Sequence, residues 1–222
     1  MLRNRLVSIE NQPLIVFEGP ETISDHLYNK HKFYESDIFE RWINYFPSSG
    51  LMLDIGANIG NHTVMFKNVF PNLKIWAFEP ILDNFLLLKT NTERFKDVNI
   101  FNVGVGSKTG MVNFDVSELS YNSGTSKVTS SPGYKNLVVA LDDIDFSNEQ
   151  IKFIKIDVEG HECSCFEGMM NLLVKHKPVI WAEDYNEIYK RTTNNSINLL
   201  QRIGYEIIHF EHEANFLLTY KQ

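Results

Sequence analysis

From residue 51 onward, short apolar segments alternate with longer segments of helical periodicity, and this alternation limits the fold more than any other feature of the chain. The short segments are apolar along most of their length, as is typical of parallel strands that are covered on both faces. The alternation predicts an α/β, doubly wound fold: a mostly parallel sheet with right-handed crossovers and helices on both faces. Strands are expected at 51–55, 73–78, 98–105, 151–156 and 178–182, and helices at 61–70, 81–95, 162–176 and 196–203.

The two ends of the chain depart from this alternation. Residues 205–210 and 215–220 are expected to form a closing hairpin, which adds an antiparallel last strand to the sheet. Residues 1–49 are interpreted as an N-terminal helical cap, packed on a main domain of residues 50–222. Within the cap, the pattern predicts a strand at 13–17 and helices at 21–29 and 36–46.

A stretch at about 106–144 interrupts the main domain. It is expected to contain strands at 111–116 and 137–141 on either side of a Ser-, Gly- and Tyr-rich loop at 117–134. Long loops inside compact domains are usually functional, so this stretch is interpreted as an insertion on the substrate side of the cleft. A surface hairpin without a role in the site is the alternative.

Charge and apolar run length argue against several classes of partner. The 222 residues include 28 Asp and Glu against 21 Lys and Arg, a net charge of -7, without any run of four basic residues. Because nucleic acids are held by clustered Lys and Arg, they are not expected as partners. The apolar runs are far shorter than the roughly 20 residues of a membrane span, and no signal peptide is evident. Cys163 and Cys165 are too close for an unstrained disulfide, which favours reduced thiols in a cytoplasmic protein.

The strongest motif is the glycine loop Asp54–Gly60, with the sequence DIGANIG, between the first strand of the sheet and a helix. Glycines permit a tight turn and close approach of a ligand, and a helix N-terminus attracts anionic groups. A G-x-G-x-x-G dinucleotide loop would need a third glycine, which this loop lacks. The next strand ends at Glu79, where an acid can accept hydrogen bonds from ribose hydroxyls. The two features together predict a cofactor that contains adenosine.

A second group of polar residues follows the strand at 151–156. Ligands of open α/β sheets bind outside the carboxyl ends of the strands, so Asp157 and Glu159 are candidates for a base, a metal ligand or a substrate contact. His161 is the next candidate for the base. Glu162 is interpreted as a charge at a helix N-terminus. The other histidines show no pairing that indicates a site; they are His26, His31, His62, His176, His209 and His212.

Acids also end the following strand, at Glu183 and Asp184. With Asp157 they could hold a divalent cation such as Mg²⁺. Hydrogen bonding of these acids to sugar hydroxyls is the preferred interpretation, and no metal-ligand residues are assigned.

The ordered set of motifs resembles the FkbM family of S-adenosylmethionine-dependent O-methyltransferases. The resemblance covers roughly residues 50–210. It rests on the DIGANIG loop, Glu79-Pro80, Asn91, Leu141-Asp142-Asp143, the run KIDVEGHE at 155–162, and Gly168. It implies a class I methyltransferase, Rossmann-like sheet with an antiparallel last strand, and methyl transfer to a hydroxyl.

The resemblance also implies how the site is divided. The glycine loop would hold the methionine part of S-adenosylmethionine, Glu79 with Pro80 the ribose, and the end of the third strand the adenine. The cofactor-binding residues implied are Asp54, Gly56, Ala57, Asn58, Gly60, Asn61, Glu79, Pro80, Asn102, Val103 and Gly104. His161 stands where a smaller residue is commoner in the family, and the insertion differs from it, so the acceptor stays open.

The expected activity is methyl transfer from S-adenosylmethionine to a hydroxyl of a sugar, a glycan or a glycosylated metabolite, as in polysaccharide biosynthesis. Methylation of a weakly acidic hydroxyl needs proton removal, which is assigned to Asp157 with Glu159, or to His161. A nicotinamide-dependent oxidoreductase and a catalytically inactive cofactor-binding protein are the alternatives. The sequence leaves open the identity of the acceptor, a requirement for Mg²⁺, and assembly into a homo-oligomer.

Overall fold

The computed structural model describes residues 3–19, 21–115, 127–129, 133–146, 148–184, 196–211 and 214–221. Its centre is a seven-stranded sheet. The strands are β3 (Gly50–Ile55), β4 (Leu73–Phe78), β5 (Val98–Phe101), β10 (Ile151–Ile156), β11 (Val179–Glu183), β12 (Tyr205–Glu211) and β13 (Asn215–Tyr220). They lie in the order β12-β13-β11-β10-β3-β4-β5. The strands from β11 to β5 are parallel, and β13 runs antiparallel to both of its neighbours. The predicted parallel sheet with a closing antiparallel hairpin is confirmed.

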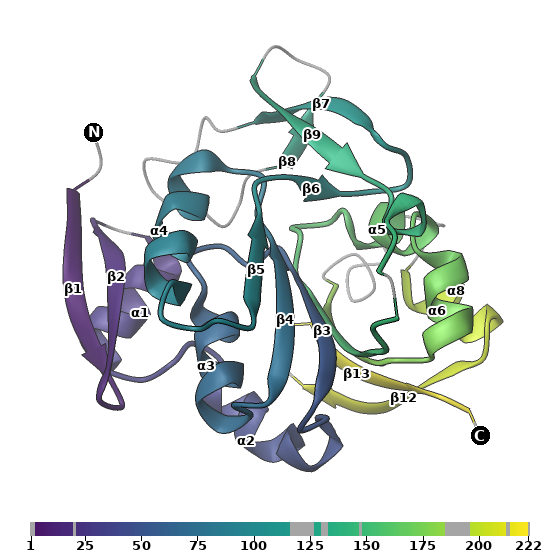
Figure 1. Ribbon diagram of the computed structural model, residues 1–222, viewed down its shortest axis with the longest axis horizontal. Helices are drawn as coiled ribbons and strands as arrows, with labels where there is room; N and C mark the ends of the chain where they lie inside the picture. The colour runs from purple at the N-terminus through teal and green to yellow at the C-terminus, as the bar shows by residue number, and fades with distance from the viewer. Residues whose placement is uncertain are drawn as a thin grey trace.

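Helices cover both faces of this sheet (Figure 1). One face carries α3 (Asn61–Val69) and α4 (Leu82–Thr92), and the other α5 (Glu162–Glu167), α6 (Met170–His176) and α8 (Ser196–Arg202). Successive strand residues enter two separate apolar cores, as the period of a strand requires. On β3, Met52 packs in one core, whereas Leu51 and Leu53 pack in the other. Of the helices described, none is long and apolar enough to cross a bilayer.

The N-terminal segment begins with a hairpin of β1 (Arg3–Ile9) and β2 (Gln12–Glu18), which lies beside α4 in Figure 1. The hairpin is followed by α1 (Thr22–Lys30), α2 (Ser36–Trp42) and a short 3-10 helix, η1 (Ile43–Tyr45). The sequence predicted β2 and both helices but not β1, in which only Val7 and Ile9 are buried. The segment shares a core with the sheet, where Trp42 packs edge-on against Trp181 of β11.

A second, smaller sheet stands above the carboxyl ends of the main strands. It has the order β6-β9-β7-β8, with β6 (Gly104–Val105), β7 (Gly110–Asp115), β8 (Lys127–Thr129) and β9 (Tyr134–Val139). Most of the predicted loop at 117–134 lies outside the described residues. The single strand predicted at 98–105 is wrong. The Asn102 side chain donates to the backbone oxygens of Glu79 and Pro80, and the chain leaves β5 there for the second sheet.

The single helix predicted at 162–176 is also wrong, because α5 and α6 are separate helices that meet at Gly168. A β-carbon on Gly168 would lie 1.9 Å from the backbone oxygen of Gly106, so the backbones of these two segments are in close contact here. After it, Asp142 in a short 3-10 helix, η3 (Leu141–Asp143), accepts hydrogen bonds from the backbone nitrogens of Asn171 and Leu172. The N-terminus of α6 is therefore capped by a carboxylate from a distant segment of the chain.

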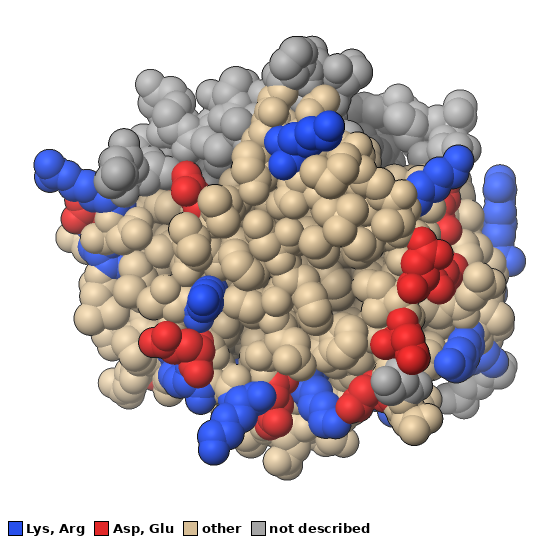
Figure 2. All heavy atoms as spheres, turned by 45° about the horizontal axis from the view of Figure 1, so that its top comes forward, with Lys and Arg blue, Asp and Glu red and all other residues tan. Residues whose placement is uncertain are grey.

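Charged side chains are dispersed over the surface. Figure 2 turns the side that carries the smaller sheet toward the viewer, and on this face Lys and Arg alternate with Asp and Glu, mostly near the margin. Among the described residues of this face, Lys and Arg form no stripe of the kind that tracks a nucleic-acid backbone.

Candidate active site

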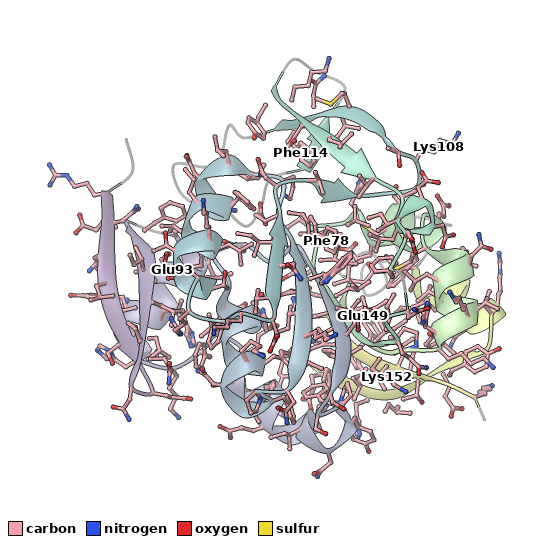
Figure 3. The ribbon with its side chains drawn as sticks, viewed as in Figure 1. Phe78, Glu93, Lys108, Phe114, Glu149 and Lys152 are labelled. Carbon is pink, nitrogen blue, oxygen red and sulfur yellow. The ribbon has the colours of Figure 1, made fainter. Side chains whose placement is uncertain are left out.

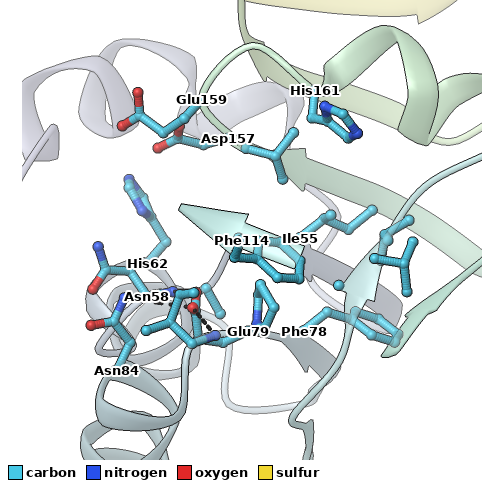
Figure 4. A pocket seen from close by; sticks show the side chains of 18 of the residues that line it. Ile55, Asn58, His62, Phe78, Glu79, Asn84, Phe114, Asp157, Glu159 and His161 are labelled. Atoms are coloured by element: carbon cyan, nitrogen blue, oxygen red, sulfur yellow. Dashed lines mark hydrogen bonds between the residues drawn. The ribbon is translucent and has the colours of Figure 1, made fainter. Parts of the chain in front are cut away.

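A pocket opens where β3, β4 and β10 end (Figure 4). Most of the residues predicted from the sequence line it: Gly56, Ala57, Asn58, Asn61, Glu79, Pro80, Gly104, Asp157, Glu159 and His161. Four do not: Asp54, Gly60, Asn102 and Val103. These four support the site from behind, as described below.

The glycine loop turns sharply because three of its residues have positive φ, namely Gly56 (81°), Asn58 (51°) and Gly60 (93°). At Gly56 the missing side chain makes room for protein rather than for ligand. A β-carbon there would lie 1.8 Å from the backbone oxygen of Asp157. The loops after β3 and β10 are therefore in direct contact, which brings the predicted cofactor loop beside the predicted catalytic loop.

Asp54 and Gly60 hold this loop in place. The Asp54 carboxylate is fully buried and accepts a hydrogen bond from the Thr63 hydroxyl on α3. Burial raises the pKa of Asp54. Gly60 precedes α3 and packs against Leu88 of α4. Both residues act on the loop from outside the pocket.

Glu79 lies at the end of β4 and links three segments of the pocket. Its carboxylate accepts hydrogen bonds from the backbone nitrogens of Asn58, at 2.9 Å, and Ile81, at 2.8 Å (dashed in Figure 4). Burial raises the pKa of Glu79 to about 7, although these two bonds favour the ionised form. Asn102, by holding the backbone oxygens of Glu79 and Pro80, fixes the turn that carries this acid. Val103 packs in the apolar core beneath.

The smaller sheet supplies an apolar wall that the sequence did not assign to the site. Phe114 of β7 and Val138 of β9 line the pocket together with Ile81, and the three form their own apolar cluster. Figure 3 shows Phe114 above the carboxyl end of the main sheet and Phe78 within the molecule. Apolar strands on a predicted insertion were the only available signal for this wall.

Buried charges gather on one face of the sheet beneath the catalytic loop. Lys155 on β10 is only 1% exposed, and its ammonium lies 3.0 Å from the Asp157 carboxylate. Burial alone would lower the pKa of Lys155, but the carboxylates of Asp157, Glu35, Glu183 and Asp54 raise it above its ordinary value. Burial and the neighbouring Asp157 raise the pKa of Glu183 to about 10. Asp157 is the carboxylate that forms the ion pair with Lys155.

The loop between β10 and α5 has a left-handed backbone at Glu159 (φ 55°) and Gly160 (φ 92°). Glu162, in the first turn of α5, accepts hydrogen bonds from the backbone nitrogens of Val158 and Gly160. This agrees with the helix-start interpretation of Glu162, whose pKa burial raises to about 7. Burial lowers the pKa of His161. In Figure 4 His161 stands apart from Asp157 and Glu159.

His62 is the histidine that sequence reasoning missed. It follows Asn61 at the start of α3, lines the pocket, and pairs with Glu35 at 2.9 Å. Asn61 itself exchanges two hydrogen bonds with the backbone of Tyr34, through Oδ1 at 2.9 Å and Nδ2 at 3.1 Å. No sequence signal could join Glu35 to His62, because the docking of the N-terminal segment brings them together.

The arrangement can bind a ligand with hydroxyl and ammonium donors and present carboxylates to a second molecule. In the described part of the chain, no three His, Cys, Asp or Glu side chains are grouped as metal ligands. Cys163 and Cys165, on α5, are free thiols.

The sheet order, with one antiparallel strand between β11 and β12, and the glycine loop between β3 and α3 are those of the class I methyltransferase fold. Two solved structures share this fold at 10% sequence identity. One is a Pyrococcus abyssi tRNA (uracil-54, C5)-methyltransferase in complex with S-adenosyl-L-homocysteine, with a TM-score of 0.52 over 98% of this chain and 43% of that chain. The other is Sp1610 of Streptococcus pneumoniae, with a TM-score of 0.50 over 83% and 70%.

Residues 54–216 match the model of the methyltransferase FkbM domain, and the chain belongs to this family of methyltransferases. It is also similar to the hexuronic acid methyltransferase AglP of Haloferax volcanii, with 30% identity over 142 residues. The matched part is 63% of this chain and 58% of AglP, so the chain spans less than two thirds of that relative. The resemblance stated from the motifs is confirmed at the level of the family.

Proposed function

We propose that this protein transfers a methyl group from S-adenosylmethionine to a hydroxyl of a sugar, either free or within a glycan or glycosylated metabolite. The observation that carries the proposal is the contact between the two loops, in which the backbone of Asp157 occupies the space beside Gly56. A cofactor held by the glycine loop would thus lie next to the carboxylates of Asp157 and Glu159. The similarity to a hexuronic acid methyltransferase supports a sugar as acceptor.

The described residues fit the cofactor. Oδ1 of Asn58 is a buried acceptor in the pocket for which the described residues provide no hydrogen-bond donor. The Glu79 carboxylate lies beside it and is bonded to the Asn58 backbone. Both acceptors suit a ligand that brings ribose hydroxyls and an ammonium group. The apolar wall formed by Phe114 and Val138 suits the flat aromatic face of adenine.

Each part of the site then has a task in the reaction. When bound, S-adenosylmethionine supplies a methyl group on a positively charged sulfur, which is already activated toward attack by oxygen. Glu79 and Pro80 hold the ribose, the glycine loop holds the methionine part, and Gly104 flanks the adenine. Asp157, fixed by Lys155, orients the acceptor hydroxyl or removes its proton, with Glu159 beside it. Alignment of the reacting atoms and exclusion of water provide much of the rate.

Calorimetry followed by a transfer assay tests the proposal. S-adenosylmethionine and S-adenosylhomocysteine are expected to bind with at least micromolar affinity, about -8 kcal/mol. Labelled methyl groups should then appear on a neutral hexose, a hexuronic acid or an oligosaccharide. Binding of a nicotinamide dinucleotide without binding of either methyl compound would support an oxidoreductase instead. Binding of the cofactor without transfer to any hydroxyl would favour the inactive cofactor-binding alternative.

A further inference from the structure

Glu35 and His62 form a buried acid–imidazole pair at the edge of the pocket. His62 Nε2 lies 2.9 Å from Glu35 Oε2, and the two side chains are only 9% and 3% exposed. His62 belongs to α3, whereas Glu35 directly precedes α2 in the N-terminal segment. Glu35 also lies outside the residues matched by the family model, 54–216. One member of the pair, Glu35, therefore comes from a part of this chain that the family match does not include.

The acid of this pair is held in a fixed position. Asn215 of β13 donates from Nδ2 to Glu35 Oε1 at 2.8 Å, and Trp181 Nε1 donates to Asn215 Oδ1. Glu35 has a φ of 59°, in the left-handed region that a residue with a side chain rarely adopts. A strained backbone and a three-member hydrogen-bond chain at one residue are typical of a functional constraint.

His62 brings this pair to the pocket. The Glu35 carboxylate lies against Nε2 of its imidazole, 2.9 Å away. His62 lines the pocket, and in Figure 4 its ring projects toward Asp157 and Glu159. An acceptor hydroxyl positioned by Asp157 would thus lie within the region that His62 also borders.

The other groups around the pocket are less suited to take up a proton. The Asp157 carboxylate is already engaged by the buried Lys155 ammonium, at 3.0 Å, and burial raises the pKa of Glu183. His161 stands apart on the other side of the loop. Several charged or titratable side chains surround this part of the pocket. They are Glu35 before α2, Asp54 on β3, Lys155 on β10, Asp157 and Glu159 in the loop after β10, and Glu183 on β11.

We propose that His62, oriented by Glu35, is the group that removes the proton from the acceptor hydroxyl. The proposal rests on the proposed function. As the oxygen–methyl bond forms and the sulfur–methyl bond breaks, the sulfur keeps the bonding electron pair and becomes a neutral thioether. The hydroxyl proton passes to the His62 imidazole, and the resulting imidazolium is stabilised by the Glu35 carboxylate beside it. Asp157 then orients the hydroxyl, and Glu35 is a positioning residue.

Single-turnover methyl transfer across a range of pH, at saturating cofactor, tests this role. His62→Gln keeps an amide that can donate to Glu35 but has no basic nitrogen. The transfer rate is expected to fall by about 10²–10⁴-fold, the usual contribution of a general base. The cofactor dissociation constant should stay within about threefold. His31→Asn, an exposed histidine of the N-terminal segment, is the matched control and should keep the parent rate.

Glu35→Gln separates catalysis from structure. Removal of the Glu35 charge takes away the partner of the imidazolium that forms during transfer, so the pH profile of the single-turnover rate should move to lower pH than in the parent. A lower melting temperature with an unmoved pH profile would indicate a structural role only. If His62→Gln transfers methyl groups within about threefold of the parent rate, the inference is wrong while the proposed function stands. A parent protein that transfers to no hydroxyl would overturn both.

Discussion

Binding of the cofactor should expel a proton from Glu79. In the free protein, burial raises the pKa of this carboxyl to about 7, so near neutral pH about half of the molecules carry it protonated. Ribose hydroxyls donate hydrogen bonds, and they bind the ionised carboxylate better than the acid. The cofactor therefore selects the charged form, and it must bind more tightly as the pH rises.

The size of the effect follows from this pKa. If the carboxyl of the complex ionises below about pH 5, binding releases roughly 0.9 proton at pH 6, about half a proton at pH 7 and roughly 0.1 at pH 8. The dissociation constant then falls by about tenfold between pH 6 and pH 8. Glu79→Gln keeps the shape but cannot titrate, so this part of the proton release disappears. Glu79→Ala also removes charge-assisted hydrogen bonds worth about 1.5–3 kcal/mol and should weaken binding by roughly tenfold to a hundredfold.

The same carboxyl affects the stability of the free protein. Its pKa is raised from 4.5 in the reference state to about 7 in the folded protein, so the folded state binds more protons between these values. The stabilising contribution is fully present below about pH 4.5 and is lost as the pH rises through 7. The shift corresponds to about 3 kcal/mol. Glu79→Gln should flatten this part of the stability profile, as measured by urea unfolding at several pH values.

Calorimetry in buffers of different ionisation enthalpy measures the released proton directly. The amino group of the cofactor and other side chains also contribute, but they do so equally in the parent protein and in Glu79→Gln. Glu162→Gln is the control, since Glu162 has a pKa of about 7 for the same reason yet does not line the pocket. Equal proton release by the parent protein and Glu79→Gln at pH 6 would refute the reasoning.

Three further predictions concern the catalytic loop and the glycine loop. Asp157→Asn should lower the single-turnover rate by about 10²–10⁴-fold with little change in cofactor affinity, and a rate within about threefold of the parent would remove Asp157 from the mechanism. Activity should persist in the presence of a chelator; complete loss that Mg²⁺ restores would show a required metal. Gly56→Ala places a β-carbon 1.8 Å from the Asp157 backbone oxygen at a φ of 81°, so urea unfolding should show a loss of about 2–4 kcal/mol. Gly110→Ala, which meets nothing within 4 Å, should change stability by less than about 0.5 kcal/mol.

The sequence determined the main sheet and the position of the cofactor loop. Strands such as β3 and β10 are buried along most of their length on both faces, so most of their residues are apolar and the strands can be recognised without a partner. The glycine loop and Glu79 are also local signals, because a tight turn and an acid at the carboxyl ends of parallel strands indicate a ligand site in any open α/β sheet. These features depend on neighbours in the sequence, which is the information that periodicity carries.

Elements at contacts between distant segments were predicted less well. The helix at 162–176 is broken because Gly168 meets the backbone of Gly106, and the strand at 98–105 ends where Asn102 binds the turn at Glu79. The strand β1 was missed because it is stabilised by pairing with β2 and has few buried side chains. In each case a tertiary contact outweighs the local preference.

The candidate site divides in the same way. The sequence alone placed Asp157, Glu159 and Glu79 at strand ends, and the structure brings all three to one pocket. Only the tertiary structure joined His62 to Glu35, 27 residues earlier, and brought the Glu35 carboxylate close enough to raise the pKa of the buried Lys155. Local periodicity indicates which segments become strands and helices, because the spacing of buried residues in each segment depends little on which other segment packs against it. The pairing of particular polar groups follows from the docking of segments far apart in the chain, where a buried charge must find a partner.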